Sequence, residues 1–192
     1  MLDKIKKLRE ITGAGMVDVK KALDEAQGDE ERATEILKKK CKEKAFKKSE
    51  RIAQEGVIVS YVHSNNKVGA IVKLFCETDF VARNEEFKTL AQDIAMHITA
   101  MNPKYIKPEE VDENVLEKER KIWQEQLENE NKPKEIISKI ISGKEKKFRE
   151  EISLLSQPFV KNQEQTIQDL IIEKIAKIGE NIQVGEFYRI EL

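Results

Sequence analysis

The chain has 192 residues, enough for one medium-sized domain and a small one. Its 35 basic and 36 acidic residues leave a formal net charge of -1, so no global field favours nucleic acid or an anionic membrane. Two cysteines exclude a disulfide framework, the N-terminus lacks an apolar signal core, and the apolar runs are far too short to cross a bilayer. These features predict a cytoplasmic protein with reduced thiols.

Residues 1–41 are predicted to form three short helices. The first is broken by the glycines at positions 13 and 15, and the second runs from about residue 16 to residue 26. Gly28 fits the position after a helix end and Asp29 fits an N-cap, so a third helix follows. The first helix carries Leu2, Ile5, Leu8 and Ile11 on one face. The positions that face inward on the other two are Val19, Ala22, Leu23, Ala33, Ile36 and Leu37.

The segment 38–48 carries seven lysines. One interpretation is a patch that binds nucleic acid. The other is a solvated helical linker. The residues favour the linker, because Glu43 and Glu50 interrupt the positive charge and no aromatic stacking platform accompanies it.

Residues 56–77 are predicted to form a β-hairpin with its turn at Ser64-Asn65-Asn66. The second strand, residues 68–75, is rich in residues that favour strands. A helix is predicted at residues 85–101, where apolar side chains recur at helical spacing and Asn84 is a good N-cap.

The residues between this strand and this helix carry the most information in the chain. Asp79 and Phe80 stand side by side there, and a strand-to-helix junction is where a rigid scaffold presents side chains to a partner. The other interpretation makes Asp79 a local cap and Phe80 a core residue. The residues alone favour the second interpretation, since a buried phenylalanine is common.

A highly charged stretch, residues 112–155, is predicted to form two helices with narrow apolar stripes. Residues 129–133 separate them, and Pro133 fits the first turn of the second helix. Narrow stripes and a short break predict an antiparallel helical hairpin at about residues 112–153, projecting from the core as an arm.

The last segment, residues 182–192, is predicted to be a third strand after a helix that Thr166 caps and Gly179 ends. Three strands can form one antiparallel sheet. One alternating set is strongly apolar: Val57, Val59, Tyr61, Ala70, Val72, Leu74, Val184, Tyr188 and Ile190. The opposite set is mixed: Ile58, Val62, Ile71, Phe75 and Phe187, interrupted by Ser60, Lys73 and Arg189. A half-solvated sheet should show a more polar face than this, so the mixed face is expected to meet a second sheet.

Catalytic and metal-binding chemistry finds little support in the sequence. Neither His63 nor His97 has a second cysteine or a pair of carboxylates at metal-ligand spacing, and Cys76 is better explained as a small packed residue. The glycines at 13 and 15 lack the following Lys-Ser/Thr of a phosphate-binding loop. We therefore expect no cofactor, no metal and no nucleotide held by the chain itself.

Five segments resemble the elongation factor Ts family, in the family's order along the chain. Thr78-Asp79-Phe80-Val81 is similar to the family's Thr-Asp-Phe-Val signature. The other four are residues 8–23, 95–97, 132–136 and 156–160. Together they span nearly the whole chain, which a chance match of one motif would not do.

The resemblance implies a guanine nucleotide exchange factor that binds elongation factor Tu in its GDP-bound and nucleotide-free states. It implies that Thr78, Asp79, Phe80 and Val81 dislocate the partner's Mg²⁺, with Phe80 as a wedge and Asp79 disturbing the segment that bears the metal's ligands. No covalent bond would be made or broken, so the chain would not be an enzyme.

Further contacts with the GTPase are implied at matching positions. Met16 and Val17 lie in a segment that resembles the family's ubiquitin-associated-like module, and His63 resembles a histidine that meets a distal domain of the partner. The arm would touch the GTPase domain as well. Longer family members carry two related half-cores, whereas this chain has one sheet. We therefore expect a homodimer through the mixed sheet face.

The predicted fold class is α+β. A three-helix module and linker at residues 1–50 precede a core and dimerisation domain at residues 51–192, in which a three-stranded antiparallel sheet packs with helices. Partners other than elongation factor Tu and a second copy, such as nucleic acid or a membrane, are not expected. Two competing interpretations are an adaptor that binds without changing nucleotide release, and an RNA-binding protein whose binding would depend steeply on salt.

Overall fold

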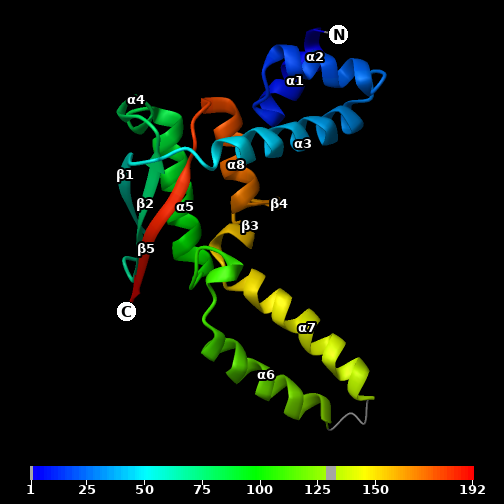
Figure 1. Cartoon of the computed structure of the whole chain (residues 1–192). Helices are drawn as coiled ribbons and strands as arrows, with labels where there is room; N and C mark the ends of the chain where they lie inside the picture. The colour runs from blue at the N-terminus through cyan, green and yellow to red at the C-terminus, as the bar shows by residue number, and fades with distance from the viewer. Residues whose placement is uncertain (1, 129–132) are drawn as a thin grey trace. The chain divides into compact units, whose positions relative to one another are not determined.

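The computed structural model describes residues 2–128 and 133–192 and has the predicted α+β class, with eight α-helices among the described residues (Figure 1). The chain divides into two compact units. Met1–Thr99 and Gln168–Leu192 form the first unit, and Ala100–Ile167 form the second. The predicted boundary near residue 50 stays a prediction.

Three helices open the first unit: α1 (Leu2–Thr12), α2 (Met16–Glu25) and α3 (Glu30–Lys48). The Asp29 carboxylate caps α3 by accepting a hydrogen bond from the Arg32 backbone N–H at 3.0 Å. Their small core is built mainly from Leu8, Val19, Ala22, Ala33 and Leu37. Ile172 and Ala176 from α8 (Ile167–Ile178) pack against it, so the three helices do not complete their core alone.

The lysine-rich segment lies within α3, which is longer than predicted because lysine, glutamate and alanine are good helix formers. Several of the lysine ammonium groups are paired locally: Lys40 with Glu25, Lys42 with Asp169 and Lys44 with Asp18. This pairing favours a structural role for the segment over a nucleic-acid patch.

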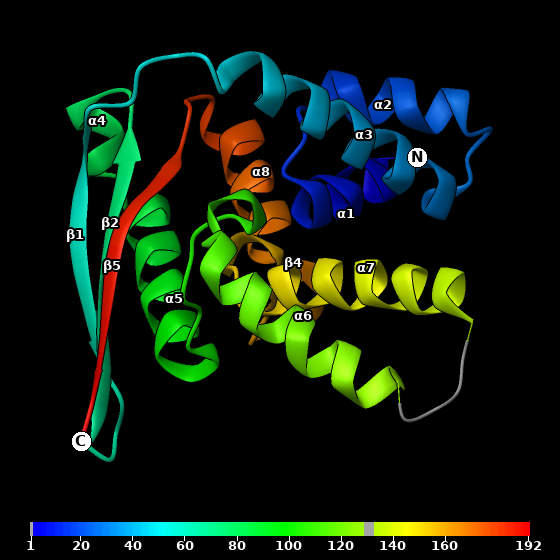
Figure 2. The same ribbon diagram turned by 60° about the horizontal axis from the view of Figure 1, so that its bottom comes forward.

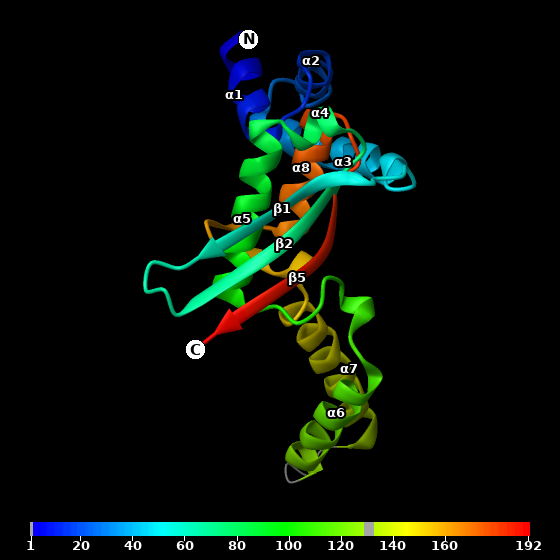
Figure 3. The same cartoon turned by 90° about the vertical axis from the view of Figure 1, so that its left-hand side faces the viewer.

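The strands β1 (Glu55–Val62), β2 (Val68–Cys76) and β5 (Gln183–Glu191) form an antiparallel sheet in the order β1-β2-β5. Figure 3 looks onto this sheet, with the β1–β2 turn at one end and the short helix α4 (Asp79–Ala82) at the other. The predicted hairpin, third strand and three-stranded antiparallel sheet are confirmed, whereas the second, two-stranded sheet of β3 (Pro158–Phe159) and β4 (Asn162–Thr166) was not predicted.

A β-bulge reverses the predicted faces of β5 beyond Val184, which keeps its predicted face opposite Leu74. Val72 pairs with Phe187 and Leu74 with Val184, so β5 advances one residue more than β2 between these pairs. Phe187 therefore lies on the buried face with Val72, and the prediction that it lies on the mixed face is wrong. Side-chain alternation resumes beyond the bulge with the opposite phase.

The bulge also moves two residues to the outer face. Tyr188 is 63% exposed and Ile190 is 74% exposed, whereas both were predicted to share the strongly apolar face with Val72 and Leu74. Arg189 takes an inner position, where its guanidinium Nε donates to the Thr99 carbonyl at 3.0 Å. Gly185, at the bulge, lies under the Phe75 ring, and a Cβ there would come within 2.6 Å of it.

The helix α5 (Glu85–Met101) covers the inner face of the sheet (Figure 2). The Asn84 side chain accepts from the Glu86 backbone N–H at 2.7 Å, which confirms the predicted N-cap. α8 lies next to α5, and Lys177 forms an ion pair with Glu86. The side chains buried between the sheet and these helices include Ala70, Val72, Leu74, Phe87, Leu90, Ile94 and Ile98.

The second unit contains the predicted helical hairpin, formed by α6 (Glu113–Glu128) and α7 (Lys134–Glu151). Trp123 packs edge-on against Phe148, with ring centroids 5.8 Å apart. Pro133 is the N-cap of α7, and the predicted break at residues 129–132 lies outside the described residues. The unit is completed by η1 (Pro108–Glu110), η2 (Leu154–Ser156), β3 (Pro158–Phe159) and β4 (Asn162–Thr166).

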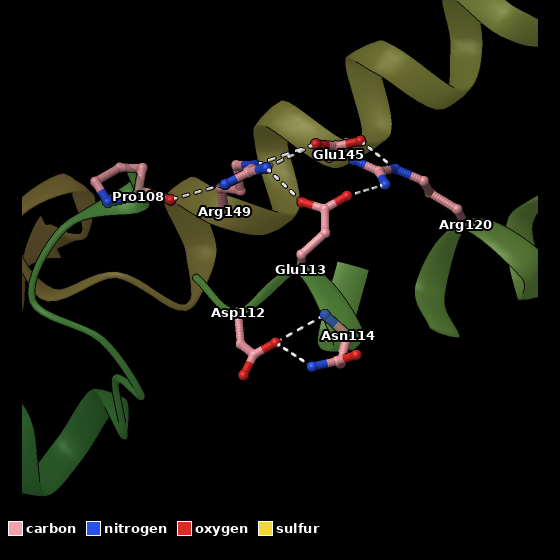
Figure 4. A network of polar contacts seen from close by, with 7 residues as sticks. All are labelled: Pro108, Asp112, Glu113, Asn114, Arg120, Glu145 and Arg149. Atoms are coloured by element: carbon pink, nitrogen blue, oxygen red, sulfur yellow. Dashed lines mark hydrogen bonds and ion pairs between the residues drawn. The ribbon is translucent and has the colours of Figure 1, made fainter. Parts of the chain in front are cut away.

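A charge network joins the two helices of the arm (Figure 4). Arg120 pairs with Glu113 and donates from Nε to Glu145 at 2.6 Å, and Arg149 donates from Nη2 to Glu145 at 3.0 Å. Arg149 also donates to the Pro108 carbonyl at 3.2 Å. The Arg120 hydrogen bond holds the pKa of Glu145 below its ordinary value. Within the described residues, no helix is long and apolar enough to cross a membrane.

Candidate partner-binding site

The junction between β2 and α5 contains a helical turn, α4, that sequence analysis missed because four residues are too few to show a period. Thr78 is its N-cap: the backbone is extended there, and the hydroxyl accepts from the Val81 backbone N–H at 3.4 Å. The predicted local cap, Asp79, is instead the first residue of the turn. The turn reverses the chain at one end of the sheet (Figure 3).

Phe80 projects from this turn with 80% of its surface exposed. None of the four residues of α4 is fully buried. Phe80 is therefore not a core residue, contrary to the interpretation that the residues alone favoured. An aromatic side chain that the fold leaves in water is free to be buried by a partner.

Asp79 is held by a local ion pair. The Arg83 guanidinium approaches its carboxylate at 3.0 Å, one helical turn along the chain. The Asp79 side chain is 47% exposed and that of Arg83 is 78% exposed, so solvent screens the pair. Asp79 can therefore change partners at small cost.

The carboxylate of Glu180 holds the start of the turn. It accepts hydrogen bonds from the backbone N–H groups of Glu77 and Thr78, both at 3.1 Å, and from the Thr78 hydroxyl at 2.7 Å. Sequence analysis did not identify Glu180, because it lies more than 100 residues away and no local pattern marks it.

Cys76 ends β2 as a buried packing residue, as predicted. Its Sγ lies 3.2 Å from the Thr78 carbonyl oxygen, and burial raises the pKa of the thiol to about 11. The thiol is therefore protonated near neutral pH and is a poor nucleophile. His97 is buried in α5, and the described residues contain no group of His, Cys, Asp and Glu side chains that could hold a metal ion.

His63 lies at the tip of the β1–β2 hairpin, exposed to solvent. Its backbone N–H donates to the Val68 carbonyl at 2.9 Å, and its Nδ1 lies 3.4 Å from the Tyr61 hydroxyl. The hairpin tip and α4 lie at opposite ends of the nine-residue strand β2, which spans about 30 Å. His63 and Phe80 are therefore not parts of one contiguous pocket.

Met16 and Val17 occupy the first turn of α2, directly after its N-cap Gly15. They are 54% and 67% exposed, so neither completes the small helical core. Asp18, beside them, pairs with Lys44 of α3, and this hydrogen bond holds the pKa of Asp18 below its ordinary value. The pair fixes the start of α2 against α3 and leaves two apolar side chains in solvent.

The predicted site residues therefore form three separate surfaces. Thr78 to Val81 are contiguous on and before α4, His63 stands alone at the hairpin tip, and Met16 and Val17 lie on the helical module. Each surface presents exposed side chains on a backbone held by hydrogen bonds. Such an arrangement suits a protein that binds a larger partner at several points rather than one that encloses a small substrate.

Comparisons with known proteins identify the family. The family described as elongation factor TS matches residues 5–192. The chain is 52% identical over 188 residues to the elongation factor Ts of Carboxydothermus hydrogenoformans, covering 98% of this chain and 87% of that protein. It is 53% identical over 188 residues to that of Fervidobacterium nodosum, covering 98% and 95%, and 50% identical over 190 residues to that of Pseudothermotoga lettingae, covering 99% and 96%. The chain therefore belongs to the elongation factor Ts family of translation elongation factors.

Proposed function

We propose that this chain is a guanine nucleotide exchange factor for elongation factor Tu. It binds the GDP-bound GTPase, weakens the binding of GDP and Mg²⁺, and remains on the nucleotide-free form until GTP enters. The observation that carries the proposal is the exposed Phe80 beside Asp79, in a sequence similar to the family signature and on a turn fixed by Thr78 and Glu180.

Exchange of this kind rests on reciprocal coupling between two ligands of the GTPase. If the factor lowers the affinity of the GTPase for GDP about a thousandfold, GDP lowers the affinity for the factor equally, or about 4 kcal/mol each way. The factor therefore needs surfaces that bind the GTPase and one element that disturbs the nucleotide site. The three surfaces described above supply both.

The bound Mg²⁺ is the vulnerable point of the nucleotide site. Magnesium demands near-ideal octahedral geometry, has few protein ligands and neutralises the charge of the nucleotide phosphates. A small displacement of the segment that carries those ligands therefore releases both the ion and GDP.

In this proposal Phe80 inserts between side chains of the GTPase domain as a wedge. Asp79 leaves Arg83 and perturbs the segment that bears the metal's ligands. Thr78 and Val81 set the turn on which both side chains stand. No covalent chemistry is involved, so the chain is not an enzyme in that sense.

The other two surfaces provide binding energy rather than exchange. Met16 and Val17 offer an apolar contact to the GTPase domain, and His63 reaches a distal domain of the same partner. The arm at residues 112–153 contacts the GTPase domain. Because translation elongation takes place in the cytoplasm, we expect the chain to work there, without nucleic acid or membrane as a partner.

A homodimer through the outer face of the sheet forms part of the proposal. Within the described residues no element covers that face, which carries Ile58, Val62, Ile71, Tyr188 and Ile190, exposed by 41% to 74%. Ile58, Val62 and Ile71 were expected there from sequence, as was Phe75, which keeps this face but is partly buried, and Tyr188 and Ile190 join them through the bulge. Packing against the same face of a second copy would bury these side chains as a two-sheet sandwich.

The dimer would also bring the separated surfaces together. A two-fold axis that runs across the strands places the α4 end of one sheet over the hairpin tip of the other. One protomer could then present Asp79 and Phe80 while its partner presents His63 to the same GTPase. Lys73 of the central strand and Glu186 of β5 also lie on this face, with their charged groups 3.8 Å apart.

Stopped-flow release of fluorescent GDP from elongation factor Tu tests the proposal. We expect release to accelerate with factor concentration and to saturate, and the acceleration to shrink when a chelator removes Mg²⁺ beforehand. A complex that forms without faster release would instead support the adaptor. No complex at all, together with steeply salt-dependent RNA binding, would support the RNA-binding interpretation.

A further inference from the structure

Glu180 occupies the loop between α8 and β5, directly after Gly179, whose φ is +94°. Its two carboxylate oxygens accept three hydrogen bonds, at 2.7 to 3.1 Å, from the two residues that join β2 to α4. Hydrogen bonds to an ionised carboxylate are shorter and stronger than neutral ones. The carboxylate therefore acts as the anchor of the turn.

The hydroxyl of Thr78 links this anchor to the helical turn. A hydroxyl has one proton to donate and two lone pairs to accept with. Because Thr78 donates its proton to Glu180, its lone pairs are left to accept from the Val81 backbone N–H. Glu180 thus orients the group that caps α4.

The turn lies against β1 and β2, but no fully buried side chain of its own fixes it there. Four residues are far too few for a helix that is stable by itself. None of the residues of α4 is fully buried, and Phe80 makes little contact with the rest of the chain. The direction in which Phe80 points is therefore set mainly by the residues that precede it.

The loop that carries Glu180 is itself fixed. Asn181 is buried, its backbone N–H donates to the Glu77 carboxylate at 2.6 Å, and its side-chain amide donates to the Arg51 carbonyl at 2.7 Å. Lys48, at the end of α3, donates to the Gly179 carbonyl. Because the loop is fixed, the Glu180 carboxylate is fixed too, and its hydrogen bonds can hold the turn in one position.

We propose that Glu180 is a positioning residue for exchange: it holds Asp79 and Phe80 in the orientation that displaces Mg²⁺, without touching the partner's nucleotide site. This proposal rests on the exchange function proposed above. It assigns to one carboxylate the task of keeping a short, exposed turn rigid before the partner arrives.

Glu180→Gln is the main test, because it keeps the size of the side chain but removes its charge and leaves one accepting oxygen. Glu109→Gln, an exposed glutamate of η1 in the other unit, is the matched control. We expect Glu180→Gln to lower the maximal rate of GDP release at saturating factor about tenfold, since small misplacements of an acting group cost this much or more. The factor concentration at half-maximal rate should change much less, and Glu109→Gln should behave as wild type.

A double-mutant cycle separates positioning from general weakening of the fold. In a Phe80→Ala background Glu180→Gln should have almost no further effect, because there is no wedge left to position. An equal loss in both backgrounds, or an unchanged maximal rate, would overturn the proposal. If Glu180→Gln does not fold, Thr78→Val removes one of the three donors and must show the same cycle.

Amide hydrogen exchange provides a readout that does not depend on activity. Glu180→Gln should speed exchange at the Glu77 and Thr78 amides in the isolated protein, while the amides of α5 keep their protection. A wild-type chain that fails to accelerate GDP release would refute the proposed exchange function. Unchanged protection of these two amides in Glu180→Gln would refute the proposal that Glu180 anchors the turn. The two failures are therefore distinguishable.

Discussion

Replacing Phe80 by alanine should remove most of the exchange activity and leave the fold intact. Phe80 is 80% exposed, so only about 40 Å² of a ~200 Å² side chain is buried in the free protein. At about 25 cal/mol per Å², the fold loses at most about 1 kcal/mol, and the better helix propensity of alanine offsets part of this loss. The variant should therefore fold as the parent does.

The expected loss in exchange follows from the surface that Phe80 still has to bury. About 160 Å² remains available, worth about 4 kcal/mol on full burial, and the alanine methyl retains roughly a third of it. The net loss of about 2.5 kcal/mol corresponds to about a 60-fold lower rate. If the wedge acts only while GDP leaves, the loss falls on the maximal release rate rather than on affinity.

Stopped-flow release of fluorescent GDP at rising factor concentration measures both quantities. Phe46→Ala is a matched control, because Phe46 is 76% exposed on α3 and belongs to none of the three surfaces. Circular dichroism and thermal unfolding establish that each variant is folded. A folded Phe80→Ala variant that releases GDP as fast as wild type would refute the wedge, and an unfolded one would refute the account of Phe80 as an exposed residue.

Three further predictions concern the other surfaces. Val17→Ala should raise the factor concentration at half-maximal rate about fivefold and leave the maximal rate unchanged. The reason is that it removes roughly 1 kcal/mol of apolar contact with the GTPase at a point away from the nucleotide. A lower maximal rate would show that Val17 takes part in exchange itself. Ile71→Lys should convert a dimer to a monomer in sedimentation equilibrium at micromolar concentration. A wild-type chain that is a monomer and exchanges at full rate would refute both the dimer and the proposal that the two protomers present different surfaces to one GTPase. The folded pKa of Glu145 is depressed, so its contribution to arm stability is present above its ordinary pKa of 4.5 and is lost as the pH falls through the folded value. Fluorescence of Trp123, the single tryptophan of the chain, should report this acid transition, and Glu145→Gln should abolish it.

Patterns that repeat locally were readable from the sequence. Three helices, the hairpin with its turn, the helix after Asn84 and the two helices of the arm follow from spacing, caps and breaks within one segment. The alternation of side chains along β5 was readable too, but which residues of the strand lie on which face of the sheet was not. A single extra residue in that strand exchanges the faces of the residues beyond it. The one local signal was Gly185, because a glycine inside a strand pattern often marks a bulge or a close approach.

Features that depend on distant pairs could not be read. The turn of α4 is too short to show a period, and its anchor Glu180 comes from the opposite end of the chain. The exposure of Phe80 follows from that turn, so the residues alone pointed to a buried side chain. Only the resemblance to the family signature favoured a Phe80 side chain that is exposed to a partner.

The ion pair between Arg83 and Asp79 bears on how exchange should respond to ionic strength. Salt weakens the attraction of Asp79 for any cationic group on the GTPase, but it also weakens the internal partner that Asp79 must leave. The Asp79 side chain is 47% exposed and that of Arg83 is 78% exposed, so salt reaches the internal pair as well, and the two effects oppose each other. An exchange rate that changes little between dilute buffer and cellular salt is therefore what an Asp79 that acts through its charge should produce.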